Sequence, residues 1–465
     1  MSHKLASKGL WAHQGQRVLI KSNLHHQTRL VSTAAAQLHQ KGHGESLLSS
    51  KTKPAAPLSA LPTPSLFRSL LITAISSKPY LLGPSLSILQ WLCSSPQGRL
   101  WNIERNPVLR FILKTTFYKH FCAGETPEEA RQTLLLMKSQ GFKGTLLTYG
   151  KETVFDFETN KSHGQGDLSG IEAWRKGTME TAELLGEGDQ LALKLTGAGP
   201  SVTDAFASGN LPPQPMMDAL DEICSLCRGK NARVIIDAES QHYQAGIFRT
   251  GMVLADKYNR DGHALIYNTY QAYLKSTPQT LAVHLAAASE KGFTLGLKLV
   301  RGAYMASDKR SLIHDTKQDT DDAYNSISQG ALTRRLGVFG DTSPFPAVDL
   351  FLASHNRDSL IAAQETHQSR LRQGLKTVPL AFAQLHGMSD ALSFELIQMG
   401  GKAAREGNGE SVPAVYKCST WGTLSECLAY LMRRAAENRD AVGRTNDEYG
   451  ELKRELWRRT GLVRG

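Results

Sequence analysis

The chain has 465 residues, and 41% of them are apolar, which is enough to bury a large core in one big domain or in two smaller ones. A formal charge of +11 would suit a nucleic-acid-binding protein, but the first 100 residues hold eleven basic residues and one acidic residue. Residues 101–465 are nearly neutral, with 43 basic and 42 acidic side chains, so the sequence argues against nucleic acid as a partner. Six cysteines without a secreted spacing exclude a disulfide scaffold.

Residues 1–35 have the composition of a mitochondrial presequence. They carry five basic residues, no acid and many small or serine residues, and they lack the apolar region of a secretory signal. A disordered basic tail is the alternative. The presequence interpretation predicts delivery to the mitochondrion.

Residues 36–100 are expected to form an extension ahead of a catalytic domain over residues 101–465. Residues 41–65 are rich in Ser, Pro, Ala and Lys, which is typical of a linker. The strongly apolar segment Leu66–Cys93 is interrupted by Arg68, Lys78 and two prolines, so its apolar runs are shorter than the roughly 18–20 residues of a transmembrane helix. Contact with a membrane surface and packing on the barrel both stay open for this segment.

From residue 126 onward, short apolar runs alternate with longer helical patterns, which predicts a parallel β/α architecture. The first helix is expected to begin after Thr126, whose hydroxyl can cap it, and to end at Gly141. Eight strands are predicted, at Gly144–Thr148, Leu191–Thr196, Arg233–Asp237, Leu265–Gln271, Thr294–Val300, Val348–Ala353, Pro379–Gln384 and Ala414–Cys418. Helices are expected between them, at Ile171–Leu185, Leu281–Lys291, Arg357–Gln373, Ser389–Met399 and Leu424–Asn438. Eight strands close a barrel, so the predicted fold is a TIM-barrel-like (β/α)8 barrel with an N-terminal helical extension.

Polar side chains lie at or just after the carboxyl ends of the predicted strands, where a β/α barrel carries its chemistry. They are Lys194, Asp237, Gln271, Lys298, Arg301, His355, Gln384 and His386. Lys194 and Lys298 each interrupt an apolar run, so an inward-pointing ammonium group there must find a partner. A chance array of solvated loop residues is the alternative.

Several known cofactor and metal motifs are missing from the sequence. No G-x-G-x-x-G follows a strand, so any dinucleotide must be bound by something other than a Rossmann fold. No zinc-type histidine pair accompanies His355 or His386, and we expect no metal site. Cys224 and Cys227 form a C-x-x-C in a helical stretch and are expected to pack in the core. A Schiff-base aldolase stays open as an alternative, because a desolvated lysine becomes nucleophilic.

The last predicted barrel helix carries two adjacent arginines and a glutamate. Glu437 follows Arg433 by four residues and Arg434 by three, so each arginine can lie near the glutamate on the helix surface. Two guanidinium groups can converge on one small anion, and a carboxylate substrate is the natural candidate. A solvated surface helix is the alternative.

Five motifs follow one another in the predicted barrel: Tyr267–Lys275 (YNTYQAYLK), Lys298–Tyr304 (KLVRGAY), Leu352–Asn356 (LASHN), Gln384–Met388 (QLHGM) and Tyr430–Glu437 (YLMRRAAE). In their order and spacing they resemble the proline dehydrogenase family, and the resemblance covers approximately residues 125–445. The resemblance implies a β/α barrel that binds FAD without a Rossmann motif and oxidises proline to 1-pyrroline-5-carboxylate. It also implies hydride transfer to flavin N5, electron transfer to a membrane quinone, and a location on the matrix side of the inner mitochondrial membrane.

The resemblance further implies roles for individual residues. Lys194, Arg433 and Arg434 would bind the proline carboxylate. Asp237 and Lys298 would act as catalytic residues beside the substrate and flavin N5. The flavin contacts would be Ala238, Gln271, Arg301, Gly302, Ala303, Tyr304, Ser354, His355 and Glu437, with Gly302 allowing a close approach of the backbone and Glu437 also orienting the two arginines.

Two positions depart from the family pattern. Lys298 stands where many bacterial members have arginine, which keeps the charge but loses the planar fork. Cys418 stands where the family usually has a tyrosine against the substrate ring, so Cys418 is assigned to substrate binding without that aromatic wall. The absence of the aromatic ring could loosen proline binding, admit hydroxyproline or another cyclic amino acid, or be compensated by Trp421. A degenerate, non-catalytic barrel is a third hypothesis.

Overall fold

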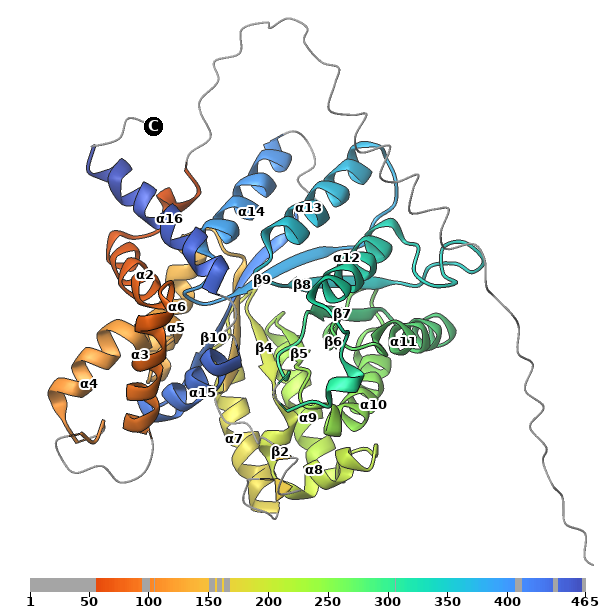
Figure 1. Cartoon of the computed structure of the whole chain (residues 1–465). Coiled ribbons are helices and arrows are strands. Elements are labelled where there is room, and N and C mark those ends of the chain that lie inside the picture. Colours follow the sequence, from red (N-terminus) through yellow and green to blue (C-terminus); the bar gives the residue numbers. More distant parts are fainter. Residues whose placement is uncertain are drawn as a thin grey trace, which may run out of the picture. The chain divides into compact units, whose positions relative to one another are not determined.

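Eight parallel strands form a closed barrel in this computed structural model, which describes residues 56–93, 101–103, 105–149, 155–156, 161–162, 168–305, 307–405, 412–437 and 442–461. The order around the barrel is β1, β10, β9, β8, β7, β6, β5, β4 and back to β1 (Figure 1). The strands are β1 (Gly144–Tyr149), β4 (Gln190–Leu193), β5 (Arg233–Ile236), β6 (Ile266–Gln271), β7 (Leu295–Val300), β8 (Val348–Ala353), β9 (Leu380–Leu385) and β10 (Ala414–Trp421). The predicted fold and all eight predicted strands are confirmed. The second strand ends early, because Leu195–Ala198 form the 3-10 turn η3.

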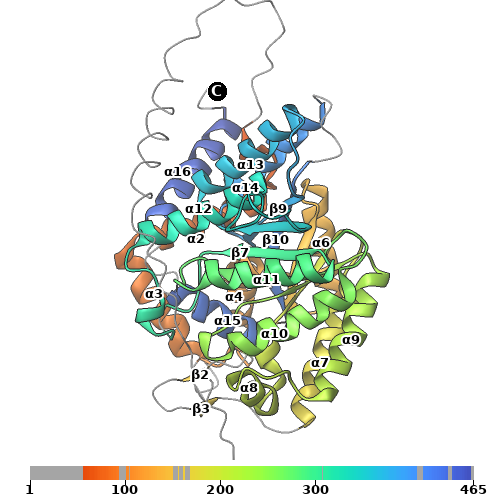
Figure 2. The ribbon, with the colours of Figure 1, turned by 90° about the vertical axis from the view of Figure 1, so that its right-hand side faces the viewer.

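Helices surround the strands (Figure 2). They are α7 (Leu168–Leu184), α8 (Pro200–Ala207), α9 (Gln214–Gly229), α10 (Gln241–Tyr258), α11 (Thr277–Lys291), α12 (Lys317–Thr333), α13 (Arg357–Arg372), α14 (Asp390–Ala403) and α15 (Leu424–Glu437). A short hairpin of β2 (Phe155–Asp156) and β3 (Lys161–Ser162) lies between β1 and α7 in the sequence. The cysteines of the C-x-x-C motif are both fully buried on α9, and burial raises the pKa of Cys227 to about 12, so core packing is confirmed.

Strand side chains alternate between the inside of the barrel and the layer of helices, as the two-residue period of a strand requires. On β10, Tyr416 and Cys418 belong to the interior cluster together with Tyr267 and Phe351. Val415 and Trp421, at the alternate positions, belong to the larger core between strands and helices. The alternation determines which polar residues can meet inside the barrel.

The N-terminal extension is helical. It consists of η1 (Pro57–Ala60), α2 (Thr63–Ser76), α3 (Pro79–Cys93), α4 (Pro107–Leu113), the π-helical turn η2 (Lys114–Tyr118) and α5 (Lys119–Phe121), and α6 (Pro127–Ser139) follows it. Thr126 caps α6 as predicted, accepting from the backbone N–H of Glu129 at 3.2 Å. The presequence and most of the predicted linker lie outside the described residues. The end of that linker is structured instead, because Leu58 and Leu61 are buried and their carbonyls accept from Arg459.

Arg459 ends the last helix, α16 (Val442–Arg459), which follows α15 and packs against α2. Its guanidinium lies 3.0 Å from the Leu58 carbonyl and 2.7 Å from that of Leu61. Residues 400 positions apart in the sequence are thereby joined at one side of the barrel (Figure 1).

Candidate active site

The two predicted inward lysines meet one carboxylate at the carboxyl ends of β4, β5 and β7. The Lys298 ammonium donates to Asp237 Oδ1 at 2.6 Å, and the Lys194 ammonium lies 3.8 Å from Asp237 Oδ2. Each lysine is only 6% exposed. The expectation that a buried ammonium group must find a partner is confirmed, and Asp237 is the partner common to both.

Lys194 is held where β4 turns into η3. Its backbone carbonyl accepts from the indole N–H of Trp174 on α7 at 2.9 Å. The next turn is tied to the end of β5, because the Thr196 N–H donates to Glu239 at 3.1 Å and its hydroxyl donates to the other carboxylate oxygen. Sequence analysis missed Glu239, although its position two residues after Asp237 could have marked it. Gln271 also reaches this residue, with its amide nitrogen 3.4 Å from the Glu239 carbonyl oxygen.

Arg301 follows β7 and joins three segments of the barrel. Its three guanidinium nitrogens donate to Asp321 at 2.7 Å, Ser354 at 2.6 Å and Ser359 at 2.9 Å. The guanidinium carbon also lies 4.3 Å from the ring centroid of Tyr324. Of this network, only Arg301 and Ser354 were predicted. A guanidinium has five N–H groups, and three of those of Arg301 donate to side chains in the described part of the chain.

Gly302 has a φ of +141°, a backbone conformation that L side chains rarely adopt. A Cβ atom there would lie 2.4 Å from the ring of Tyr273, so the close approach at Gly302 is to this ring. The Tyr273 hydroxyl donates to Asp308 at 2.7 Å, and Asp308 accepts from the Gln241 N–H at 2.9 Å. These contacts fasten the segment after β7 to the ends of β5 and β6. Ala303 and Tyr304 lie on that segment, half-exposed.

His355 follows β8 at the same end of the barrel, and its Nδ1 lies 3.0 Å from the Ser389 hydroxyl. Ala238, directly after Asp237, is nearly buried. Gln384 and His386 face the layer of helices instead. Gln384 accepts from Ser393 on α14 at 2.8 Å, and burial lowers the pKa of His386 to about 3. The expected convergence of these two side chains at the barrel mouth is therefore wrong. Gln384 occupies the outward register of β9, and His386, one residue after that strand, lies 3.0 Å from the Ser419 hydroxyl on the outward side of β10.

Sequence analysis also missed a buried cation on the outward side of β10. Lys417 is 2% exposed and contacts the Asp390 carboxylate and the Met388 carbonyl, both at 2.7 Å. It alternates with Cys418, which lies on the inward side of the strand and is half-buried. Trp421 does not stand in for the missing aromatic wall, because it belongs to the outer core and its indole donates to Thr181 on α7 at 2.9 Å.

The arginine pair lies on α15, as predicted. Gly422, with a φ of +136°, leads from β10 directly into this helix. The first turns of α15 bury Leu424, Cys427 and Leu428, and the Tyr118 hydroxyl donates to the Gly422 carbonyl at 2.7 Å. The side chains of Arg433, Arg434 and Glu437, in the last turns, lie outside what the structure describes, and their convergence on a substrate stays a prediction.

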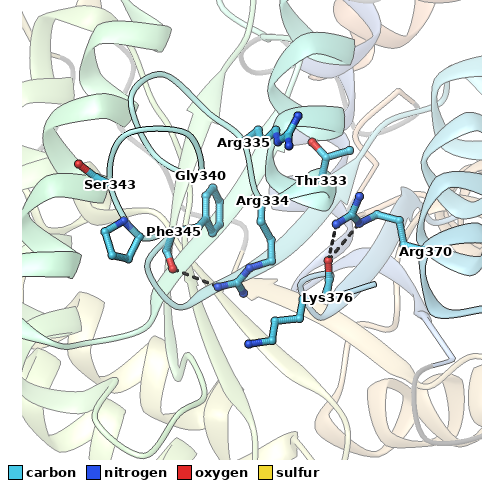
Figure 3. Close-up of a pocket in the computed structure, with 9 residues that line it drawn as sticks. Thr333, Arg334, Arg335, Gly340, Ser343, Phe345, Arg370 and Lys376 are labelled. Carbon is cyan, nitrogen blue, oxygen red and sulfur yellow. Dashed lines mark hydrogen bonds between the residues drawn. The ribbon is translucent and has the colours of Figure 1, made fainter. Parts of the chain in front are cut away.

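A basic pocket of about 380 Å³ lies at the opposite end of the barrel strands (Figure 3). Arg334, at the end of α12, donates to the Phe345 carbonyl, and Arg370, in the last turn of α13, donates to that of Lys376. Cations at helix carboxyl termini balance the helix dipole, which accounts for the charge of this pocket without a ligand. Among the described residues, no group of three His, Cys, Asp or Glu side chains is arranged to hold a metal ion.

Comparison with known proteins identifies relatives over most of the chain. The probable mitochondrial proline dehydrogenase of Schizosaccharomyces pombe is 28% identical, with 85% of this chain and 88% of the relative aligned. The mitochondrial proline dehydrogenase 2 of Arabidopsis thaliana is 30% identical, with 86% and 87% aligned. The hydroxyproline dehydrogenase of Bos taurus is 27% identical, with 85% and 90% aligned.

Solved structures support the fold. Proline utilization A from Bdellovibrio bacteriovorus, inactivated by N-propargylglycine, superposes with a TM-score of 0.59 at 15% identity. The match covers 89% of this chain and 42% of that longer one. The family model for proline dehydrogenase matches residues 130–447, which include every barrel strand and α15. The chain therefore belongs to the proline dehydrogenase family of enzymes.

Proposed function

We propose that the chain is a mitochondrial, FAD-dependent enzyme that oxidises L-proline to 1-pyrroline-5-carboxylate. The observation that carries the proposal is the pair of buried lysines at the barrel mouth, both within 4 Å of Asp237. Positive groups in a site shielded from water favour binding of a small carboxylate. Proline is a small carboxylate, and the mitochondrial relatives are named for its oxidation.

Lys194, Arg433 and Arg434 are proposed to bind the proline carboxylate. The backbone of Lys194 is fixed by its bond to Trp174, and α15 is seated by its buried first turns. Such fixed groups hold the substrate ring in one orientation, and positioning of this kind can lower a barrier by several kcal/mol. Glu437 would orient the two arginines by charge-assisted hydrogen bonds.

The strand ends fit a flavin by the chemistry of their donors. Arg301 has N–H groups left for an acceptor, and Gln271, Ser354 and His355 add polar groups at neighbouring strand ends. Ala238, Gly302, Ala303 and Tyr304 would complete the contacts from the loops after β5 and β7. FAD, when bound, would accept the hydride of proline at N5 and pass the electrons to a quinone of the inner mitochondrial membrane, on the matrix side. Lys298 would place its charge beside N5, where negative charge develops.

Hydroxyproline is the second candidate substrate. Cys418 lies on the inward side of β10 and is half-buried, at the position where the family usually has an aromatic ring. A small side chain there leaves room for a ring with an added hydroxyl group. The relative from Bos taurus is named a hydroxyproline dehydrogenase, so both substrates occur among similar proteins.

A visible absorption spectrum of the purified full chain tests the proposal. We expect a bound-flavin spectrum that bleaches when proline is added without oxygen. Faster bleaching by hydroxyproline than by proline would favour the second candidate. Protein that shows no flavin spectrum, and gains none with added FAD, would instead support a barrel that has lost its catalytic function.

A further inference from the structure

We propose that the outward sides of α2, α3 and α4 form the surface by which this protein rests on an anionic phospholipid bilayer. The surface, called here the outer apolar face, consists of Phe67, Leu71, Tyr80, Leu81, Ile88, Trp91, Trp101, Val108, Phe111 and Ile112. The inference builds on the proposed delivery of electrons to a membrane quinone, and it names the part of the chain that makes the contact.

The outer apolar face concentrates the exposed apolar side chains of the molecule. Ten of the nineteen large apolar side chains exposed among the described residues lie between Phe67 and Ile112, in about a tenth of the chain. Scattered apolar residues on a surface are ordinary, whereas a contiguous group marks an interaction site. In Figure 1, α2, α3 and α4 lie together at one side of the barrel.

The helices are apolar on two sides, which is unlike a surface helix of a soluble protein. On α4, Val108, Phe111 and Ile112 are exposed with the spacing of one helix face. Leu109 and Leu113 point the other way, into a cluster with α15. The same division occurs on α3, where Ile88 and Trp91 are exposed and Leu89 and Leu92 lie in that cluster, and on α2, where Phe67 and Leu71 are exposed and Leu66 and Thr73 are buried.

No charged side chain occupies an exposed position on α2 or α3. Arg68 and Lys78, the charged residues of this part, are half-exposed. On the barrel helix α13, by contrast, the exposed positions include Arg357, Asp358 and Glu365. The outer sides of α2 and α3 therefore lack the charges that keep an ordinary helix face in water.

The charge around the outer apolar face matches anionic lipid. Among the described residues from 56 to 121 there are six basic side chains, Arg68, Lys78, Arg105, Arg110, Lys114 and Lys119, and no acidic one. Arg110 and Lys114 form ion pairs with Glu125 and Glu129, so most of the attraction to lipid is assigned to the other four. Basic groups beside an apolar surface are attracted by the negative potential of anionic lipids. Tyr80, Trp91 and Trp101 add side chains that prefer the boundary between headgroups and acyl chains, and the rings of the two tryptophans lie 5.5 Å apart.

Among the described residues, no helix is long and apolar enough to cross a membrane. The contact proposed here is therefore with one leaflet. The inner sides of the same helices pack on α15 through Leu92, Ile103, Leu113, Leu424 and Leu428. Docking would thus place the helix that carries Arg433 and Arg434 next to the bilayer, where a quinone is dissolved.

Flotation of the full-length holoprotein with lipid vesicles tests the surface. Wild-type protein is expected to bind vesicles of phosphatidylcholine mixed with phosphatidylglycerol, and to bind them more weakly in high salt. The combined variant Ile88→Ser, Val108→Ser and Phe111→Ser changes side chains that are 59%, 66% and 67% exposed, so its fold should be kept. We expect its vesicle partitioning to fall by about tenfold or more, because three apolar groups no longer leave water.

A matched control changes three exposed apolar residues of the barrel, Val283→Ser, Val338→Ser and Leu375→Ser, and should bind vesicles as the wild type does. Equal partitioning of the first variant and the wild type would overturn the proposal. So would a wild-type dimer in solution that the first variant abolishes, because the face would then belong to a second copy of the chain.

The same proteins separate this inference from the proposed function. Proline-dependent reduction of a soluble dye needs no membrane, so it tests the function by itself. The first variant should reduce the dye at the wild-type rate and lose most of its reduction of a quinone embedded in the vesicles. If the wild-type protein reduces the dye but does not bind vesicles, the proposed membrane surface is contradicted and the proposed function is not.

Discussion

The two ends of the barrel interior are built from the same strands, and both contain charged side chains. At the amino end, Arg233 donates to the Tyr267 hydroxyl and lies 3.9 Å from Asp349. The Ala264 N–H also donates to Asp349, at 2.9 Å. The rings of Tyr267, Phe351 and Tyr416 then fill the space, with centroids 6.1 Å and 5.6 Å apart.

At the carboxyl end, two lysines approach Asp237, and the small Ala353 and Cys418 occupy inward positions at the end of β8 and in the second half of β10. Side-chain volume therefore distinguishes the two ends more clearly than charge does. Aromatic rings close the amino end, as expected of a structural core, whereas small side chains occupy inward positions toward the carboxyl end, where a β/α barrel carries its chemistry. An ion pair inside the barrel can thus serve stability at one end, whereas substrate binding is the role proposed for the other.

Replacing the aspartate at each end should give the largest effects and separate the two roles. Asp349→Ala removes the acceptor of the buried Ala264 N–H and the carboxylate beside Arg233, whose side chain is 36% exposed, so we expect the free energy of unfolding to fall by about 2 kcal/mol. We expect kcat/KM for proline to stay near the wild-type value below the melting temperature. Asp237→Ala should destabilise the fold to a similar degree and also lower kcat/KM by at least about 100-fold, since the lysines that we propose to contact substrate and flavin lose their common partner.

Chemical denaturation and dye-reduction kinetics of both variants measure these changes. Asp237→Asn serves as a milder control, because it keeps the shape of the side chain. An equal loss of kcat/KM in the two alanine variants would show that the amino end is not purely structural, and the contrast between the ends would fail.

The arginine pair is the next test of the carboxyl end. Arg433→Met removes one proposed partner of the substrate carboxylate and keeps an apolar side chain of similar length. We expect kcat/KM for proline to fall by about 100-fold, which corresponds to about 3 kcal/mol of transition-state stabilisation. The melting temperature should change little. Arg372→Met, at an exposed position on α13, is the control, and unchanged kcat/KM in Arg433→Met would remove this arginine from its proposed role.

The loss of folding stability at low pH should arise from a histidine in the helical layer, outside the barrel interior. Burial lowers the pKa of His284 on α11 to about 4, and its ring nitrogen lies 2.8 Å from the Tyr270 hydroxyl. The unfolded chain protonates this histidine below about pH 6.5, whereas the folded protein does so only near pH 4, so stability is lost as the pH falls through that window. Between about pH 6.5 and pH 4, His284→Gln should therefore lose about 2 kcal/mol less free energy of unfolding than the wild type. Parallel pH profiles of unfolding for variant and wild type would contradict the assignment.

The barrel and its inward lysines could be predicted from the sequence because their signals are local. A lysine between leucines in a short apolar run marks both a strand and a buried cation, as at Lys194 and Lys298. Asp321 and Ser359 could not be found in this way. They meet Arg301 only because α12 packs against β7 and α13 packs against α12, and no local pattern encodes that proximity.

Register explains the prediction that failed. Gln384 is the last residue of a predicted strand, as Asp237 is, and His386 follows two residues later. A shift of one position along a strand, however, moves a side chain to the opposite face. Asp237 continues the inward series of Ile235, whereas Gln384 alternates with the inward Ala383. A polar residue at the end of a strand therefore predicts a residue of the site only when it continues the alternate positions that point into the barrel.

The smallest expected effect concerns Cys418, in the wall of the proposed substrate site. Cys418→Tyr would restore the aromatic ring that the family usually has, on the inward side of β10 beside Leu385 of β9. We expect KM for proline to fall by about fivefold, or about 1 kcal/mol, and turnover of hydroxyproline to fall, because the ring would pack on proline and exclude an added hydroxyl. Cys418→Ser is the matched control and should leave both substrates unchanged. A rise in hydroxyproline turnover in Cys418→Tyr would show that the small side chain does not widen the site, and that the difference in packing between the two ends of the barrel does not set substrate choice.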